Sequence, residues 1–178
     1  MAQVQGQDRL VVPENNIVPE KIRAGIALEI NGEGYRHTGD PDMPLLWYLR
    51  DVLQLTGTKY ADATGVGGAD LVLIDGKATS AITVPMSKLA GRRVTTVEGL
   101  AGADGALHPL QQAFIDEDAI GCGYCTAGWL MAGVDLLRRH PHPNDADIDT
   151  LPNLCRCGCQ GRVRKAIQRV GAGKGAPA

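Results

Sequence analysis

The stretch Cys122-Gly-Tyr-Cys125 and the later stretch Cys155-Arg-Cys157 carry the clearest chemical pattern in the 178-residue chain. Each places two thiols on one tight turn, close enough to share a metal site. The chain has five cysteines, and none precedes Cys122. An odd number of cysteines gathered in one part of a chain makes a poor disulfide framework, so the pattern predicts a metal centre.

The two cysteine pairs each stand shortly before a predicted helix. A helix start offers free N–H groups and partial positive charge, which suit the anionic four-thiolate [2Fe–2S] cluster. Tetrahedral zinc is also bound by four thiolates, so the local spacing leaves both iron and zinc open. The predicted ligands are Cys122, Cys125, Cys155 and Cys157. The fifth cysteine, Cys159, is either a small buried residue or an alternative ligand.

The patterns outside the cysteines predict strands first and helices afterwards. Apolar runs followed by turn residues predict strands at 27–30 and 71–74, with a third candidate at 94–97. A helix is predicted over residues 45–53, with Pro44 at its start. After Gly102 the apolar spacing predicts four short helices joined by short connections, at 109–119, 126–139, 145–150 and 162–170. The polar residues 1–24 are predicted to form an extension, and residues 171–178 a flexible tail.

Composition excludes several classes of partner. The net charge of −2 gives no reason to expect nucleic acid or an anionic membrane surface. No apolar run is long enough for a membrane span, so direct membrane insertion is not expected. Residues 1–20 show no pattern of a cleavable signal peptide. The expected compartment is therefore the cytoplasm, and the alternative is the periplasm, reached by export in the folded state with a partner subunit.

Ordered blocks of sequence carry a resemblance over roughly residues 26–170. They include Pro44-Leu-Leu-Trp-Tyr-Leu-Arg-Asp51, Leu107-His-Pro-Leu-Gln-Gln-Ala-Phe114, Cys122-Gly-Tyr-Cys-Thr126 and Asn153-Leu-Cys-Arg-Cys-Gly158. With these blocks the chain resembles the small iron–sulfur subunit of the molybdenum hydroxylases, the xanthine dehydrogenase and aldehyde oxidoreductase family.

The resemblance implies an α+β fold, with an N-terminal β-grasp domain of the plant-ferredoxin type over residues 25–100. A C-terminal four-helix domain over residues 101–170 would bind one [2Fe–2S] cluster through Cys122, Cys125, Cys155 and Cys157. It also implies an oxidoreductase complex in which a large partner subunit holds a molybdopterin cofactor and oxidises the substrate. No catalytic residue is then expected in this chain, which passes on single electrons.

The sequence departs from this family where a second cluster is expected. The family pattern C-x4-C-x2-C with a later fourth cysteine falls on Asp62, Gly67, Asp70 and, for the fourth, on or next to Ile82. None of these is a cysteine, so the β-grasp loop is predicted to hold no cluster. Asp62 and Asp70 could hold a hard cation such as Ca²⁺, but a solvated polar loop is favoured because no regular calcium-loop spacing is present.

Loss of the outer cluster implies that electrons leave by another route. A haem, flavin or iron–sulfur protein docked near the helical domain is the expected acceptor. Two further residues bear on the site: the family usually has Gln where this chain has Gly121, and Arg156 stands between two predicted ligands, either tuning the cluster or lying as a surface charge. The alternative function is a structural or assembly subunit whose fold is stabilised by zinc and which has no redox role.

Overall fold

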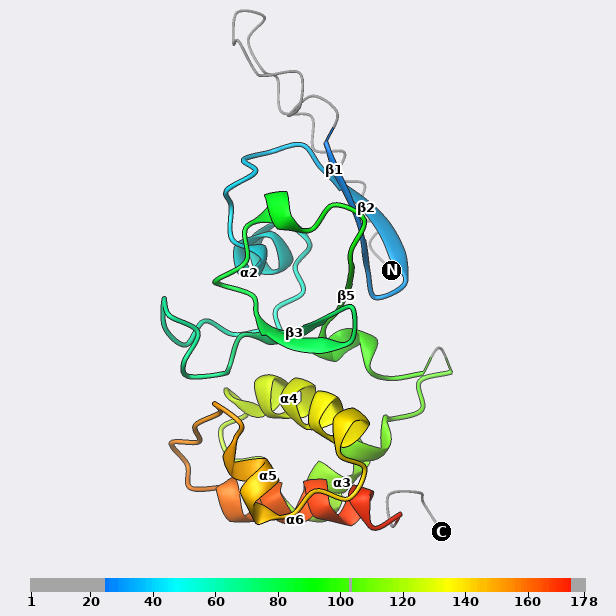
Figure 1. The fold of residues 1–178 in the computed structure, drawn as a ribbon, viewed down its shortest axis with the longest axis vertical. Helices are drawn as coiled ribbons and strands as arrows, with labels where there is room; N and C mark the ends of the chain where they lie inside the picture. Colours follow the sequence, from blue (N-terminus) through cyan, green and yellow to red (C-terminus); the bar gives the residue numbers. More distant parts are fainter. Residues whose placement is uncertain (1–24, 103, 174–178) are drawn as a thin grey trace, which may run out of the picture.

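The computed structural model describes residues 25–102 and 104–173. The predicted extension at 1–24 and the last five residues of the predicted tail lie outside the described residues. Within them a sheet packs on one side of a group of helices (Figure 1). The strands are β1 (Ile26–Ile30), β2 (Glu33–His37), β3 (Leu71–Ile74), β4 (Lys77–Ser80) and β5 (Arg93–Thr95).

The strands form one mixed sheet in the order β2-β1-β5-β3-β4. β1 pairs antiparallel with β2 and parallel with β5, which in turn pairs antiparallel with β3. The two hairpin turns use Asn31-Gly32 and Asp75-Gly76, and all four residues have positive φ angles between 51° and 84°. Such turns match the right-handed twist of the paired strands, which explains why Asn-Gly and Asp-Gly sequences stand there.

The predicted helix at 45–53 differs in its hydrogen bonding. An α-helical turn, α2 (Leu45–Trp47), passes directly into a π-helical turn, η1 (Tyr48–Val52), in which the Leu53 N–H donates to the Tyr48 carbonyl at 3.0 Å. Pro44 stands at the N-cap and is not the first helical residue. Leucines 45, 46 and 49 are fully buried against the sheet, so the apolar residues of the predicted helix share one buried face.

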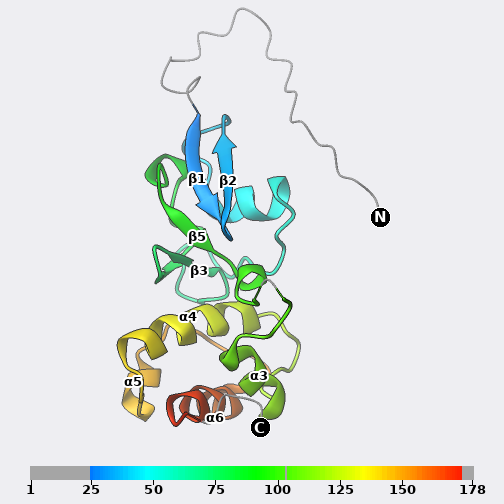
Figure 2. The ribbon, with the colours of Figure 1, turned by 90° about the vertical axis from the view of Figure 1, so that its right-hand side faces the viewer.

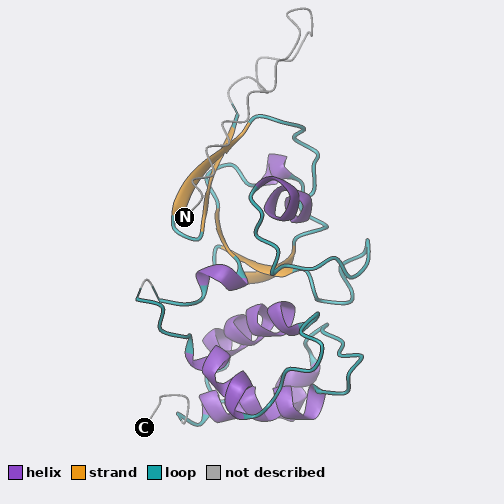
Figure 3. Ribbon diagram, turned by 180° about the vertical axis from the view of Figure 1, so that it is seen from behind, coloured by secondary structure: helices purple, strands orange, loops and turns teal. Residues whose placement is uncertain are grey.

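Four α-helices follow, as predicted: α3 (Pro109–Asp116), α4 (Thr126–Arg139), α5 (Asp145–Asp149) and α6 (Gln160–Gly171) (Figure 3). His108 caps α3, because its Nδ1 accepts the Leu110 N–H at 3.1 Å. Asn144 caps α5 in the same way and exchanges hydrogen bonds with Asp147. These capping bonds satisfy backbone groups that a helix start leaves free. Three short 3₁₀ or π turns, including η2 (Met86–Lys88) and η3 (Val97–Gly99), complete the path.

Helix α4 joins the sheet to the other helices. In both Figure 1 and Figure 2 it lies between β3 and the helices α3 and α6. Leu71 and Leu73 of β3 share a buried cluster with Met131 and Ala132 of α4. The fold is therefore α+β, as predicted. The expected domain boundaries stay predictions, and α6 runs to Gly171, one residue past the expected end of the helical domain.

Candidate metal centre

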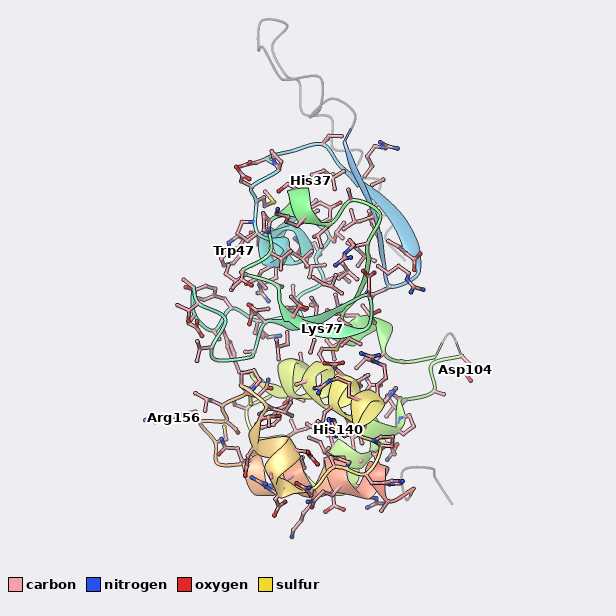
Figure 4. All side chains as sticks on the ribbon, in the orientation of Figure 1. His37, Trp47, Lys77, Asp104, His140 and Arg156 are labelled. Atoms are coloured by element: carbon pink, nitrogen blue, oxygen red, sulfur yellow. The ribbon has the colours of Figure 1, made fainter. Side chains whose placement is uncertain are left out.

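The predicted ligands lie on two turns that lead into helices. Cys125 is the N-cap residue of α4, and Cys159 is the N-cap residue of α6. The helix starts that the sequence predicted therefore stand directly beside the cysteine turns. Figure 4 shows Arg156, from the second turn, at the outer edge of the molecule, pointing away from the ribbon. Its side chain is exposed.

The four predicted ligands form two pairs, and each pair draws one residue from each turn. The side chain of Cys122 hydrogen-bonds that of Cys157, and the side chain of Cys125 hydrogen-bonds that of Cys155. The first pair is exposed, and the second is half-buried. Across residues 25–102 and 104–173, no three His, Cys, Asp or Glu side chains gather closely enough to hold a single metal ion. Two neighbouring pairs of thiols suit the two irons of a [2Fe–2S] cluster, and four thiolates also suit one tetrahedral zinc.

The proton affinities of the thiols follow this pairing. The Tyr124 N–H is the main cause of a lowered pKa at Cys122. At its partner Cys157 a backbone N–H bond lowers the pKa, but the Cys122 thiol and burial outweigh that bond and raise it. Burial raises the pKa of Cys125 to about 12. Burial also acts on Cys155, but N–H groups of Cys159 and Cys157 outweigh it and lower its pKa. Each pair thus contains one thiol with a lowered pKa and one with a raised pKa.

Backbone N–H groups already point at these sulfurs. The Cys159 N–H donates to the Cys155 Sγ at 3.3 Å, and Tyr124 supplies an N–H to Cys122. Such bonds stabilise negative charge on sulfur and tune the potential of an iron–sulfur cluster. The donor set and these N–H groups therefore fit a [2Fe–2S] cluster.

The lack of a side chain at Gly121 leaves space for the side chains of Cys157 and Cys159. A Cβ atom placed on Gly121 would lie 2.8 Å from the Cys157 Cβ, closer than real contacts allow, and at a tight 3.0 Å from the Cys159 Sγ. Cys159 itself is buried, and its sulfur accepts a bond from Arg162 at 3.2 Å. The absence of the usual Gln at this position is thus matched by close packing of two cysteines. Sequence reasoning missed the Arg162 contact, although helical spacing from an N-cap residue could have suggested it.

The four positions on which the family pattern for an outer cluster falls are joined in two pairs by hydrogen bonds. The Asp62 carboxylate accepts the Gly67 N–H at 2.7 Å, and the Asp70 carboxylate accepts the Ile82 N–H at 3.0 Å. Asp62 also accepts bonds from the hydroxyl and N–H of Thr64. The Thr64 hydroxyl, followed by the Gly67 N–H, holds the pKa of Asp62 well below its usual range. A carboxylate thus serves the loop as an internal acceptor of hydrogen bonds.

The two carboxylates do not form a cation site together. Asp70 is fully buried, and the Ser80 hydroxyl donates to one of its oxygens at 2.5 Å. Its other oxygen, Oδ1, is buried without a hydrogen-bond partner. Asp62 lies partly exposed in the loop outside. Neither belongs to a group of three candidate ligands within the described residues.

The outer loop and the cysteine turns are bonded directly to each other. The buried Asn153 side chain donates to the Gly68 carbonyl at 2.7 Å, and the Leu154 N–H donates to the Gly67 carbonyl at 3.4 Å. From the first turn, the Tyr124 hydroxyl donates to the Tyr60 carbonyl. A hollow of about 500 Å³ lies between these loops, lined by residues of both, including Ala61, Gly67, Cys122, Cys125, Cys155 and Arg156. Tertiary contacts of this kind leave no periodic signal in the sequence.

Comparison with known proteins adds a family to this geometry. A family model described as a [2Fe-2S] binding domain matches residues 96–168. A nicotinate dehydrogenase subunit of Pseudomonas putida is 45% identical over 147 residues, which are 82% of this chain and 93% of that protein. The chain belongs to the small iron–sulfur subunits of the molybdenum hydroxylases. The family match makes iron the metal expected at the cysteine pairs and disfavours zinc.

Solved structures agree with the family assignment. Quinoline 2-oxidoreductase of Pseudomonas putida 86 superposes with a TM-score of 0.75 at 31% identity, over 85% of this chain and 98% of that one. Aldehyde oxidoreductase of Desulfovibrio desulfuricans superposes with a TM-score of 0.78 at 34% identity, over 84% of this chain. The present chain spans only 17% of the length of that aldehyde oxidoreductase. No helix among the described residues has the length and apolar character needed to cross a membrane.

Proposed function

We propose that this chain carries electrons through one [2Fe–2S] cluster bound by Cys122, Cys125, Cys155 and Cys157. The observation that carries the proposal is the arrangement of these thiols as two pairs, Cys122 with Cys157 and Cys125 with Cys155. Each pair would bind one iron, and a bound cluster supplies a centre that takes up and releases one electron at a time. The backbone N–H groups that donate to the sulfurs of Cys155 and Cys122 would stabilise the negative charge of that centre.

The electrons come from a large partner subunit that holds molybdopterin and oxidises the substrate. Cys122 and Cys157 are exposed, whereas Cys125 and Cys155 are half-buried. The iron bound by the exposed pair would therefore lie nearer the surface, where a partner's redox centre can approach it. Nicotinate and quinoline appear in the names of two similar proteins, so N-heteroaromatic compounds are the first substrates to try.

The β-grasp loop takes no part in this relay. Its former ligand positions are joined in pairs by the hydrogen bonds from Gly67 to Asp62 and from Ile82 to Asp70. Each bond ties a backbone N–H to a carboxylate where the family would bind a cluster. Electrons would then leave the single cluster for a haem, flavin or iron–sulfur protein docked near the helical domain. The cytoplasm is the compartment proposed for the complex.

The test is reduction of the cluster by substrate in the complex of this chain with its large subunit. Under anaerobic conditions, adding an N-heteroaromatic or aldehyde substrate is expected to bleach the visible absorbance of the cluster. The Cys125→Ala variant is expected to lose that absorbance before any substrate is added. A complex that oxidises substrate with an artificial dye while its cluster stays oxidised would count against the electron-transfer role. A colourless chain that contains zinc would indicate a structural subunit with no redox role.

A further inference from the structure

Cys159 lies beside two of the proposed ligands, Cys155 and Cys157, although one [2Fe–2S] cluster uses only four thiolates. Its side chain is 1% exposed. Its own N–H donates to the Cys155 Sγ at 3.3 Å. A Cβ atom placed on Gly121 would lie 3.0 Å from the Cys159 Sγ and 3.1 Å from the Cys157 Sγ. Both sulfurs therefore border the same small volume, so the fifth thiol lies beside the proposed ligand Cys157.

The position of the Cys159 sulfur is fixed from two sides. The residue caps α6, so its backbone is part of a helix start that packs into the helical core. Arg162, one turn further along α6, donates to the Cys159 Sγ at 3.2 Å and also contacts the Asp118 carboxylate at 2.6 Å. A cysteine that served only as a small apolar residue would need no such polar partner. The buried sulfur is thus held beside the ligands by its backbone and by Arg162.

We propose that Cys159 is a reserve ligand that takes the place of Cys155 when the Cys155 sulfur leaves its iron. The inference rests on the proposed cluster. In the exchange, the iron–sulfur bond to Cys155 breaks and a bond from the same iron to Cys159 forms. The proton of the Cys159 thiol passes to the released Cys155 thiolate. The charge and the oxidation state of the cluster are therefore unchanged, and no oxidant or reductant is needed.

Cys155 is the ligand to be replaced because the structure already joins it to Cys159. The two residues lie on the same turn, and the Cys159 N–H bonds the Cys155 sulfur directly. Cys122 lies on the other turn and pairs with Cys157. The neighbouring glycine at 158 has a φ of 75°, a conformation that lets the chain turn sharply between the ligands and the start of α6.

The experiment compares alanine variants of the chain in complex with its large subunit, by iron content and by EPR of the reduced protein. Alanine supplies no oxygen or sulfur that could bind iron. Cys155→Ala is expected to keep its cluster with altered g-values, because one ligand differs. The double variant Cys155→Ala/Cys159→Ala is expected to lose the cluster, and Cys159→Ala alone is expected to keep the wild-type signal. Cys122→Ala is the matched control and is expected to lose the cluster although Cys159 is present.

Four outcomes overturn the reserve-ligand role: loss of the cluster in Cys155→Ala, its retention in the double variant, its loss in Cys159→Ala alone, or its retention in Cys122→Ala. If the Cys155→Ala chain does not fold or does not bind its large subunit, the wild-type and Cys159→Ala complexes are compared during incubation with EDTA. Visible absorbance is expected to decay several-fold faster in Cys159→Ala, since no thiol recaptures the iron that Cys155 releases. Equal decay overturns the inference. A wild-type complex that contains no iron would overturn the proposed function itself. That result is distinct from failure of the reserve-ligand role alone, in which the wild type keeps its iron.

Discussion

The buried side chain of Asn153 donates a hydrogen bond of 2.7 Å to the carbonyl oxygen of Gly68. Asn153 immediately precedes the turn that carries Cys155, and Gly68 lies in the loop that contains Asp62, Gly67 and Asp70. The bond therefore ties the turn of the proposed metal centre to this loop. It gives the loop a structural role beside the cysteines.

Replacing Asn153 by Ala should destabilise the protein. The substitution leaves the buried Gly68 carbonyl without this donor, and an unsatisfied buried polar group costs about 1–3 kcal/mol. The measurement is the apparent melting temperature of the purified protein. Leu154→Ala is the control, because this neighbouring side chain is 64% exposed and its loss should change stability by less than about 0.5 kcal/mol. Equal melting temperatures for the two variants would show that the Asn153 bond contributes nothing.

Helix α4 should tolerate no side chain at Gly128. A Cβ atom there would lie 1.8 Å from the Gly68 carbonyl oxygen and 2.9 Å from the Ala69 Cα, both backbone atoms that cannot swing aside. Gly128→Ala must push α4 away from the loop, at a cost on the order of 3 kcal/mol by analogy with overpacked cores.

The matched helical control for Gly128 is Gly161 in α6, where an added Cβ meets nothing within 4 Å. Gly161→Ala should stabilise the protein slightly, by less than about 1 kcal/mol, because alanine favours the helix. Thermal unfolding of both variants checks the pair. A Gly128→Ala protein as stable as Gly161→Ala would contradict the close approach of α4 to the loop.

How far the sequence predicts this fold can be judged from particular elements. The strand at 71–74 and the helix at 126–139 were predicted with the bounds observed, because a buried apolar run and a long helical period each leave a local signal. The third strand was predicted at 94–97 and lies at Arg93–Thr95. Its parallel partner β1 is distant in the chain, and pairing with a distant strand leaves no local signal.

The π-helical turn at Tyr48–Val52 shows a different limit. Passing from α-helical to π-helical bonding changes which N–H meets which carbonyl, yet it keeps Leu45, Leu46 and Leu49 buried. Apolar spacing in the sequence indicates which face of a helix is buried, but it does not indicate the hydrogen-bond pattern. At the proposed metal centre, the spacing placed two cysteines on each turn but did not predict their pairing across the two turns. Nor did it predict the bond from Asn153 to Gly68.

Asp62 should order its loop, and the effect should depend on pH. Its pKa is lowered in the folded protein, so its contribution is fully present above the unfolded value of about 3.9 and declines as pH falls toward the lowered value. At neutral pH, Asp62→Asn should therefore be cleaved faster by thermolysin within residues 61–68. The exposed Asp51→Asn is the control and should be cleaved like the wild type.

The melting temperature at acidic pH gives a second test of the role of the Asp62 carboxylate. The difference in melting temperature between wild type and Asp62→Asn should be largest at pH 5 and above, and should shrink as the pH is lowered below about 4. A difference that grew on acidification would mean that the carboxylate is not the acceptor for Thr64 and Gly67.

Restoring cysteines should restore the outer cluster. Asp62, Gly67, Asp70 and Ile82 are joined in pairs by hydrogen bonds from Gly67 to Asp62 and from Ile82 to Asp70. A variant with cysteine at all four positions should bind a second [2Fe–2S] cluster, seen as about two further irons per chain. A variant with cysteine at only 62 and 67 is the control and should gain none. No added iron in the fourfold variant would show that these are not the former ligand positions.

The central claim is a single [2Fe–2S] cluster on Cys122, Cys125, Cys155 and Cys157, with no cluster in the β-grasp loop. Metal analysis together with low-temperature EPR of the dithionite-reduced complex tests it most directly. The account predicts about two irons per copy of this chain and one rhombic [2Fe–2S] signal from it. Four irons with two signals, or zinc with no signal from this chain, would contradict it.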